Sequence, residues 1–431
     1  MKKPVVIILA GGANSRFWPL REKSLYRFMD VPLLTKQINV YRDSGFEEFI
    51  VIANPGNRDM IADLVADKAD IAVQTEPLGM GNAILQARDF LAERDFPPIY
   101  VCQVNDVVES ALHQKLMDAY QSGRAASYLA GFTVSDYFPG GYLSVDGDGS
   151  ITGLVEKPGA GNEPSDLVNI VAHVHTETKA LIDGIDALYA VNHPNDDHYE
   201  VAMAQLMKDM RFEVVRYGGR WHPIKYPWHV LDVTHFYLSQ INGQHVHPEA
   251  KLYGEVTILG DVIIEAGAKI FPGAAIVGPA YIGANTIVGN GALVRESHVG
   301  PGCVVGHTSE VARSYLERKV NLHRAVVLDS VFEENVNFSA GCVTANLRID
   351  GGTIKSTVKG DHIDSGRDKL GAMVGANTFI GIQSGTMPGV KLGANSEVGA
   401  FTNVVSDLPE ETRRYAVQTY EETGATGKID S

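Results

Sequence analysis

Residues 258–294 read ILGDVIIEAGAKIFPGAAIVGPAYIGANTIVGNGALV, with an aliphatic side chain at every sixth position. The recurring residues are Ile258, Ile264, Ile270, Ile276, Ile282, Val288 and Val294. This period predicts a parallel β-helix, in which each coil has three short strands and each strand points one aliphatic side chain into a shared axial core.

The repeat continues beyond this stretch, first one residue out of phase and then again near the C-terminus. Its further members are Val299, Val305, Val311, Val374, Ile380, Leu392, Val398 and Val404, with Thr386 in the one missing place. Glycine often follows the aliphatic residue, as in Ile282-Gly283 and Val305-Gly306. Chance spacing of common residues is the alternative, but seven consecutive matches at one period argue against it.

The chain has 431 residues, more than one hydrophobic core usually spans, so we expect two domains. The repeats begin near Tyr253, which leaves about 240 residues ahead of them for a separate globular unit.

Charge and cysteine content exclude several classes of protein. The net charge is −15 at pH 7 and no cluster of five Lys or Arg occurs, which disfavours a nucleic-acid or anionic-membrane surface. Cys102, Cys303 and Cys342 have no metal-ligand spacing, so we expect buried thiols in a reducing compartment. The apolar run Val5–Ala10 is shorter than that of a signal peptide, and no segment reaches 18 apolar residues, so we expect a cytoplasmic protein.

The region ahead of the repeats alternates apolar runs with amphipathic segments. The expected strands are Val5–Leu9, Phe49–Ala53, Ile71–Gln74, Ile99–Gln103 and Ser127–Phe132, and the expected helices are Leu33–Ser44, Arg58–Asp67, Gly81–Ala92 and Ser110–Ser122. This alternation predicts an α/β domain with a parallel, doubly wound sheet. Ligands bind such sheets outside the carboxyl ends of the strands.

Glycines and polar residues follow three of these strands: Gly11-Gly12, Gly79–Gly81 and Asn105-Asp106. Consecutive glycines let backbone N–H groups face a phosphate without an obstructing Cβ. Asp106 is either a helix N-cap or a metal ligand, and phosphate-binding elements at the same sheet edge favour the metal ligand.

Several motifs in this region resemble those of the sugar-1-phosphate nucleotidyltransferases. LAGGANSRFWPLREKSLYRF, residues 9–28, has the Gly-rich loop followed by Arg16, Pro19-Leu20 and Lys23. QTEPLGMGNA (74–83) resembles the nucleobase-binding segment of uridylyltransferases, and VNDVV (104–108), GLVEKP (153–158) and LVNIVAHV (167–174) follow in the family's order.

This resemblance implies a Rossmann-like nucleotidyltransferase domain that transfers a nucleotidyl group from UTP or dTTP to a sugar-1-phosphate and releases pyrophosphate. Arg16 and Lys23 would be the catalytic cations, and Asp106 and Asp232 would hold Mg²⁺, although Asp232 has the alternative role of a helix cap. The implied nucleotide-binding residues are Gly11, Gly12, Asn14, Gln74, Gly79 and Gly81, and the implied sugar-binding residues are Gly141, Glu156 and Asn169.

Two departures from the family pattern affect nucleotide binding. Asn14 lies in the loop where the family has glycine, and Glu22 replaces a proline directly before Lys23. Asn can adopt positive φ, but at a higher cost than Gly. The run from Arg16 to Leu20 also resembles mannose-1-phosphate guanylyltransferases, which keeps GTP as an alternative nucleotide.

The repeat region resembles the left-handed β-helix of bifunctional enzymes that acetylate an amino sugar phosphate and then uridylylate it, most closely the archaeal-type N-acetylglucosamine-1-phosphate uridylyltransferases. The likeness rests on residues 321–348 and 364–381. It implies His323 as general base, with Arg295 and Asn346 in the acceptor pocket and acetyl-CoA as donor. The family's lysine and tyrosine are replaced by Ala312 and Val326, with Arg313 as a possible substitute for the lysine; a purely structural, trimer-forming role is therefore the alternative.

We expect a nucleotidyltransferase domain over 1–235, a linker helix over 236–250, a β-helix over 251–406 and a tail over 407–431. The packing of flat prism faces predicts a homotrimer. The competing class is a nucleotide-binding scaffold that keeps both folds but has lost turnover.

Overall fold

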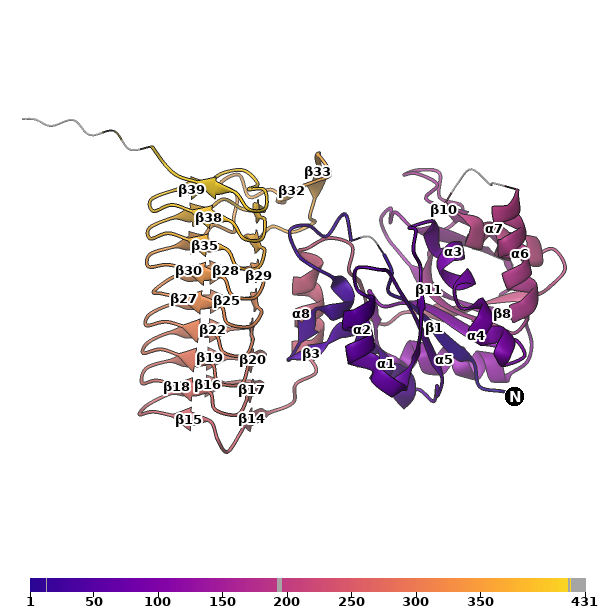
Figure 1. Cartoon of the computed structure of the whole chain (residues 1–431), viewed down its shortest axis with the longest axis horizontal. Helices are drawn as coiled ribbons and strands as arrows, with labels where there is room; N and C mark the ends of the chain where they lie inside the picture. The colour runs from indigo at the N-terminus through magenta and orange to yellow at the C-terminus, as the bar shows by residue number, and fades with distance from the viewer. Residues whose placement is uncertain (13, 192–195, 418, 420–431) are drawn as a thin grey trace, which may run out of the picture. The chain divides into compact units, whose positions relative to one another are not determined.

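A computed structural model describes residues 1–12, 14–191, 196–417 and 419, and the chain divides into two compact units (Figure 1). The first comprises Met1–Phe17 and Arg21–Val233, and the second comprises Trp18–Leu20 and the chain from Thr234 onward. Among the described residues, no helix combines the length and the apolar character that crossing a membrane requires.

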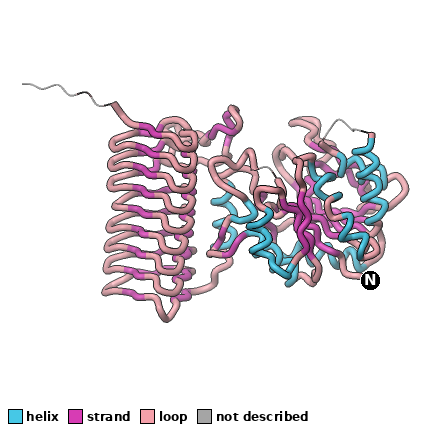
Figure 2. The backbone as a smooth tube through the Cα atoms, in the orientation of Figure 1, coloured by secondary structure: helices cyan, strands magenta, loops and turns pink. Residues whose placement is uncertain are grey.

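The first unit is built on a nine-stranded sheet, shown in magenta in Figure 2. Four of its strands are parallel, in the order β6-β1-β4-β5. They span Val5–Leu9 (β1), Phe49–Ala53 (β4), Asp70–Val73 (β5) and Ile99–Gln103 (β6). Every residue of β1 and β4 is buried, as the continuous apolar runs predicted. The expected doubly wound arrangement is confirmed in this half of the sheet.

The other half of the sheet departs from a purely parallel arrangement. Its strands are β8 (Ser127–Thr133), β9 (Gly141–Val145), β10 (Ile151–Glu156), β11 (Leu167–His175) and β12 (Phe212–Tyr217). β11 is antiparallel to both β6 and β8, so β8 runs in the same direction as β6, but β11 separates the two strands and they do not pair. The sequence pattern did not predict this antiparallel strand, because a buried apolar run looks the same whichever way its strand points.

Helices cover both faces of the sheet. The helices are α1 (Leu33–Asp43), α2 (Arg58–Val65), α3 (Gly79–Leu85), α4 (Arg88–Glu93), α5 (Ser110–Gln121), α6 (Thr178–Ala190), α7 (His198–Leu206) and α8 (His229–Leu238). Side chains of α3, α4, α6 and α7 share one core with the β1 residues Val5, Ile7 and Leu9. The single helix expected over Gly81–Ala92 is two helices, α3 and α4. Short elements complete the unit: η1 (Lys23–Leu25), β2 (Arg27–Phe28), β3 (Val31–Pro32), η2 (Ala66–Lys68), β7 (Asp106–Val108) and β13 (Trp221–Pro223).

The second unit is a left-handed parallel β-helix made of three sheets. The first sheet contains β14 (Gln244–Val246), β17 (Val262–Ile264), β20 (Ala280–Ile282), β23 (His298–Val299), β26 (Tyr315–Leu316), β29 (Val331–Phe332), β34 (Met373–Val374) and β37 (Lys391–Leu392). The second contains β15 (Lys251–Leu252), β18 (Lys269–Ile270), β21 (Ile287–Val288), β24 (Val304–Val305), β27 (Asn321–Leu322), β30 (Asn337–Phe338), β35 (Phe379–Ile380), β38 (Glu397–Val398) and β40 (Arg413–Arg414). The third contains β16 (Thr257–Leu259), β19 (Ala275–Val277), β22 (Leu293–Arg295), β25 (Glu310–Ala312), β28 (Val326–Leu328), β31 (Val343–Thr344), β36 (Gly385–Thr386) and β39 (Asn403–Val404). A hairpin of β32 (Lys355–Val358) and β33 (Asp361–Asp364) is inserted between β31 and β34.

Two expected boundaries need correction. The helix expected over 236–250 is α8, which begins at His229 and ends at Leu238, and the first β-helix strand already starts at Gln244. At the other end, β40 pairs with β38, so the coil extends into the region 407–431 that was expected to be a tail. Residues 418 and 420–431 of that region lie outside the described residues.

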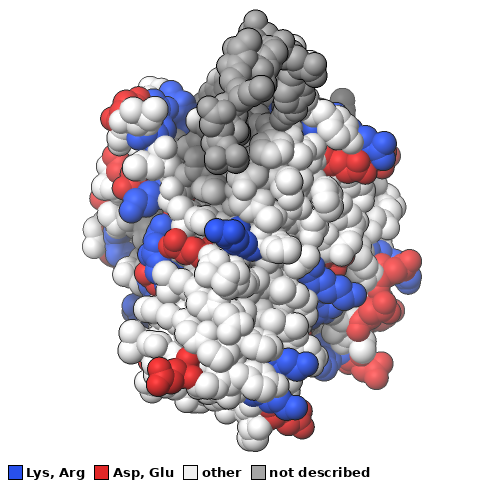
Figure 3. Space-filling model, turned by 90° about the vertical axis from the view of Figure 1, so that its left-hand side faces the viewer, with Lys and Arg blue, Asp and Glu red and all other residues white. Residues whose placement is uncertain are grey.

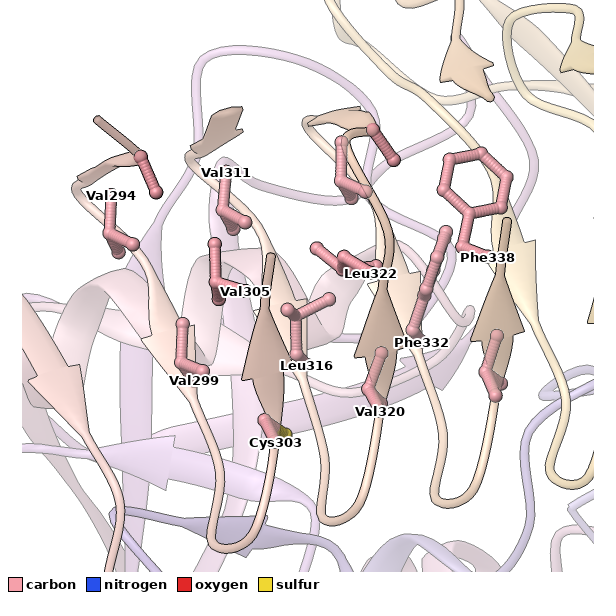
Figure 4. Close-up of a cluster of buried hydrophobic side chains, with 14 of the residues drawn as sticks. Val294, Val299, Cys303, Val305, Val311, Leu316, Val320, Leu322, Phe332 and Phe338 are labelled. Carbon is pink, nitrogen blue, oxygen red and sulfur yellow. The ribbon is translucent and has the colours of Figure 1, made fainter. Parts of the chain in front are cut away.

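The outer surface of the β-helix carries few charges over much of the face seen in Figure 3. Inside, the six-residue repeat produces the predicted core: Ile264, Ile270 and Ile276 lie on β17, β18 and β19, one on each sheet in turn. All three are at most 1% exposed, and Figure 4 shows later members of the repeat, including Val299 and Val305, stacked along the axis. Burial of each such side chain contributes roughly 1.5–3 kcal/mol.

The glycine after the aliphatic residue is explained by close packing between coils. A Cβ on Gly283 would collide with the backbone of Gly300 and Pro301, and one on Gly300 would collide with the backbone of Glu317. Neither glycine has positive φ, since neither is among the residues with φ in that region. Glycine is therefore required here by the approach of the next coil.

Candidate active site

The Gly-rich loop follows β1 at the carboxyl edge of the parallel strands. A Cβ on Gly11 would lie 3.0 Å from the carbonyl oxygen of Ala53, whereas a Cβ on Gly12 would meet no atom within 4 Å. Gly11 therefore allows close packing against β4, and Gly12 leaves an open approach for a ligand. Asn14 adopts φ 48°, and its carbonyl accepts a hydrogen bond from the backbone N–H of Phe17 at 2.8 Å.

The two predicted cations follow this loop. Arg16 is exposed, and Lys23 begins η1 with its Nζ 5.4 Å from the centre of the Phe17 ring. Burial lowers the pKa of the Lys23 ammonium to about 8, Glu22 opposes this shift, and Arg16 adds to it. Lys23 and Arg16 therefore lie close enough to interact electrostatically, and the carboxylates of Glu22 and Asp106 also act on Lys23.

Glu22, directly before Lys23, is itself held by neighbouring residues. Its carboxylate accepts hydrogen bonds from the backbone N–H and hydroxyl of Ser24, at 3.3 and 3.1 Å, and from the Asn57 amide at 3.0 Å. The carboxylate that replaces the family's proline thus caps η1 and joins it to the Asn57 side chain.

Gln74 and the Gly79–Gly81 turn form one unit. The Gln74 amide donates to the carbonyl of Gly79 at 2.9 Å and to Asn82 Oδ1 at 3.2 Å. Gly79 has φ 87°, a conformation that other residues adopt only with strain. The Gln74 side chain is buried and its donor group fixes the start of α3, while a Cβ on Gly11 would lie 3.5 Å from Gln74 Oε1. The predicted base-binding glutamine therefore adjoins the Gly-rich loop.

Asp106 is the first residue of β7, so the alternative of a helix N-cap is wrong. The indole N–H of Trp221 donates to Asp106 Oδ1 at 3.0 Å, and the buried Gln37 amide donates to the Asp106 carbonyl at 3.0 Å. Burial raises the pKa of the Asp106 carboxyl to about 6, although Trp221, Lys225 and Lys23 each oppose the shift.

The number of acidic residues near Asp106 determines how a Mg²⁺ ion could be held there. Within the described part of the chain, no group of three or more His, Cys, Asp or Glu side chains is arranged to hold a metal ion. Mg²⁺ usually takes only one or two protein carboxylates, with substrate phosphates and water as its other ligands. The Asp106 carboxylate fits that role as a single anchor.

Asp232, the second predicted metal ligand, lies in the first turn of α8. It is the fourth residue of this helix, so it is not the N-cap either. The antiparallel pairing of β13 with β7 places Pro223 opposite Asp106, and no acidic residue occupies that register position. A metal-binding role for Asp232 stays a prediction.

The three predicted sugar-binding residues come together on β9, β10 and β11. Glu156 is the register partner of Gly141, and a Cβ on Gly141 would lie 3.0 Å from Glu156 Oε2 and 3.7 Å from Asn169 Cβ. Asn169 Oδ1 bonds His173 Nε2 at 2.9 Å, and Glu156 pairs with Lys157 at 2.7 Å. Gly141 therefore leaves open a space that is flanked by a carboxylate and an amide.

Two residues near Asp106 were missed by the sequence reasoning: Trp221 and Lys225. Trp221 holds the Asp106 carboxylate, and Lys225 interacts electrostatically with Asp106, Arg16 and Glu156. No short sequence motif marks either residue as part of the site. Their positions near Asp106 arise only because β13 pairs with β7, a strand more than a hundred positions earlier in the chain.

The predicted acyl-transfer residues divide between two corners of the β-helix. Arg313 donates to both carboxylate oxygens of Asp329 at 2.7 Å, and the Asn346 amide donates to Asp329 at 2.5 Å. These three residues follow β25, β28 and β31, at one corner of the third sheet. Arg295, at the end of β22 in the same sheet, pairs with Glu310 at 3.1 Å.

His323 is exposed and precedes β28, at the opposite corner of the same sheet. One chain therefore does not bring His323 together with Arg313 and Asn346. The Arg313 guanidinium is committed to Asp329, which argues against its replacing the missing lysine.

Comparison with known proteins indicates the family of the N-terminal unit and the relatives of the chain. Residues 5–216 match the family model described as nucleotidyl transferase. The chain is 29% identical to the bifunctional sugar-1-phosphate nucleotidylyltransferase/acetyltransferase of Sulfurisphaera tokodaii, over 92% of this chain and 96% of that protein. It is also 29% identical to the bifunctional protein GlmU of Methanocaldococcus jannaschii, over 95% of this chain and 97% of that protein.

The same identity, 29%, relates it to the bifunctional protein GlmU of Methanococcus maripaludis, over 95% of this chain and 96% of that protein. The N-terminal unit belongs to the nucleotidyl transferase family, and the chain is an enzyme of that class.

Proposed function

We propose that the N-terminal unit transfers a nucleotidyl group from UTP or dTTP to a sugar-1-phosphate, N-acetylglucosamine-1-phosphate or glucose-1-phosphate. The observation that supports this proposal is that the predicted phosphate-binding and sugar-binding residues lie at the same edge of the sheet. Lys23 and Asp106 interact electrostatically, and Lys225 interacts with Asp106, Arg16 and Glu156. Lys23, Lys225 and Arg16 therefore lie near the Asp106 carboxylate, between the Gly-rich loop and the predicted sugar-binding residues.

In the proposed reaction, a phosphate oxygen of the sugar-1-phosphate attacks the α-phosphorus of the nucleoside triphosphate. The new P–O bond forms as the bond to the β-phosphate oxygen breaks, and pyrophosphate leaves with that electron pair. Loop amides after β1 bind the triphosphate, and Arg16 and Lys23 stabilise the charge that accumulates on the transferring group. Mg²⁺, held by the Asp106 carboxylate, would neutralise phosphate charge when bound. Asp232 remains the proposed second ligand.

A panel of nucleotides tests the substrate class. We expect kcat/KM for UTP or dTTP to exceed that for GTP. Gln74 and the Gly79–Gly81 turn fit a small base that lies against the backbone, and a purine needs more room. The measurement is pyrophosphate release with each nucleoside triphosphate and a fixed sugar-1-phosphate. A preference for GTP with mannose-1-phosphate would instead support a guanylyltransferase.

A second activity is favoured by the similarity to bifunctional relatives along almost the whole chain. The β-helix would transfer an acetyl group from acetyl-CoA to an amino sugar phosphate, with His323 as general base and Arg295 and Asn346 near the acceptor. Because His323 lies at a different corner from Arg313 and Asn346, this activity would require neighbouring prisms of a homotrimer. Free CoA thiol released with glucosamine-1-phosphate, and lost in His323→Ala, would support it; no release in the wild type would leave the β-helix a structural role.

A further inference from the structure

Lys225 lies two residues after the end of β13, beside the candidate site. β13 pairs antiparallel with β7, with Pro223 opposite Asp106, and the next residue, Ile224, donates its backbone N–H to the Asn105 carbonyl at 2.9 Å. The backbone N–H of Lys225 then donates to His229 Nδ1 at 3.1 Å. Lys225 is thus fixed at its backbone beside the carboxyl edge of the sheet.

Two contacts also hold the side chain of Lys225. Its Nζ donates to the carbonyl of Pro139 at 3.0 Å and lies 3.7 Å from the centre of the Phe138 ring. The Phe138 ring packs against Trp221 with 4.8 Å between ring centres, and Trp221 holds Asp106. A lysine held by one carbonyl and one aromatic face keeps its charge in a defined place and has further N–H bonds to donate.

The residues around Lys225 come from both halves of the candidate site. Pro139 lies two residues before Gly141, and the backbone N–H of Lys157 donates to the Gly140 carbonyl at 3.1 Å, so this loop belongs to the sugar-binding half of the site. Glu156 and Lys157 both act on Lys225 electrostatically, as do Asp106 and Arg16 from the nucleotide-binding half. Lys225 therefore interacts with charged residues of both the predicted nucleotide-binding half and the predicted sugar-binding half of the site.

We propose that Lys225 binds the phosphate group of the sugar-1-phosphate and orients its attacking oxygen. This inference rests on the proposed function and adds a residue to it. In this arrangement Lys23 and Arg16 bind the nucleoside triphosphate, and Lys225 binds the phosphate of the sugar-1-phosphate. An ammonium group suits this task, because charge-assisted hydrogen bonds to phosphate are stronger than neutral ones.

The test compares three variants of the full-length protein. Lys225→Met removes the charge, Lys225→Arg keeps it, and Lys179→Met is the matched control, because Lys179 also lies over an aromatic ring, that of Phe96, at an exposed site on α6. We expect Lys225→Met to raise KM for N-acetylglucosamine-1-phosphate by about tenfold or more while KM for UTP stays within about twofold. Lys225→Arg should stay within about threefold of wild type in both KM values, and Lys179→Met should match wild type.

Equilibrium binding provides a readout independent of turnover. Calorimetric titration of N-acetylglucosamine-1-phosphate into protein saturated with a non-hydrolysable UTP analogue should show the same loss of about tenfold in Lys225→Met. If Lys225→Met gives no cooperative thermal transition, Lys225→Gln takes its place, because the amide can still donate to Pro139 without a charge.

Unchanged sugar-1-phosphate binding in the charge-removing variant, or a loss confined to UTP, would overturn the role of Lys225. A wild-type protein that releases no pyrophosphate with any substrate pair would instead overturn the proposed function itself.

Discussion

Asp106 and Lys23 are the two side chains on which the proposed chemistry depends most. Asp106 would anchor the metal, and Lys23 would stabilise charge on the transferring phosphoryl group. Replacement of either by alanine should lower kcat/KM for pyrophosphate release by about 100-fold or more. Lys179→Ala, on the exposed side of α6, should behave as wild type. Turnover near the wild-type value in Lys23→Ala or Asp106→Ala would contradict the mechanism.

The same residues predict a pH dependence. Burial raises the pKa of Asp106 to about 6, so its negative charge is lost as the pH falls below about 6. Burial lowers the pKa of Lys23 and of Lys225 to about 8, so their positive charges are lost as the pH rises above about 8. A plot of kcat/KM against pH should therefore peak between these values and fall on both sides. A flat profile from pH 5 to 9 would show that these groups do not control the reaction.

Among individual residues of the candidate site, those that lie within short motifs were predicted from the sequence. Those whose position depends on long-range strand pairing were not. Gly11, Gly141, Glu156 and Asn169 were predicted as site residues because each lies in a short recognisable segment, and these roles stay predictions. Lys225 was missed because its place beside Asp106 exists only once β13 pairs with β7. The contacts of Glu22, which replaces the family's proline before Lys23, also required the fold, since Ser24 and Asn57 bind its carboxylate.

The strands and helices with the most regular patterns were predicted best. β1, β4 and β6 occupy the residues expected from their apolar runs, and the six-residue repeat located the core positions of the β-helix. The antiparallel strand β11 between β6 and β8 and the position of α8 were not predicted. The first is set by which neighbour the strand pairs with, and the second lies where the helical and β-helix patterns meet.

The core of the β-helix predicts a sharp contrast between inward and outward leucines. Leu316 on β26 is fully buried, whereas Leu259 on β16 is 55% exposed. Leu316→Ala should lower the free energy of unfolding by about 2–5 kcal/mol through lost burial and a residual cavity, while Leu259→Ala should change it by about 0.5 kcal/mol or less. Urea unfolding followed by circular dichroism measures both. Equal losses would mean that the axial core does not dominate stability.

Exposed apolar side chains on the β-helix bear on the assembly of the whole molecule. They include Val343, Phe379, Ile382, Met387 and Phe401. Apolar groups left exposed on a flat prism favour association, and three prisms can close around a threefold axis. We predict a homotrimer at micromolar concentration by sedimentation velocity. A monomer under these conditions would contradict both the trimer and an acetyl-transfer site shared between chains.

Truncation after Gln244 separates the two units. Because the candidate nucleotidyl site lies entirely within the first unit, the fragment should be monomeric and keep pyrophosphate release, but lose any activity that depends on acetyl-CoA. Activity assays and sedimentation of the fragment and the full-length protein provide the comparison. A folded fragment without nucleotidyl transfer would show that the second unit contributes to that site.

The most direct measurement on the whole molecule is the identification of its products. Full-length protein is incubated with UTP, N-acetylglucosamine-1-phosphate and Mg²⁺, and the mixture is analysed by ³¹P NMR. We predict that a nucleotide sugar and pyrophosphate appear in equal amounts, and that neither appears when the sugar-1-phosphate is left out or Mg²⁺ is chelated. Absence of a nucleotide sugar with any of the four nucleoside triphosphates and with either N-acetylglucosamine-1-phosphate or glucose-1-phosphate would contradict nucleotidyl transfer and favour a scaffold that only binds nucleotides.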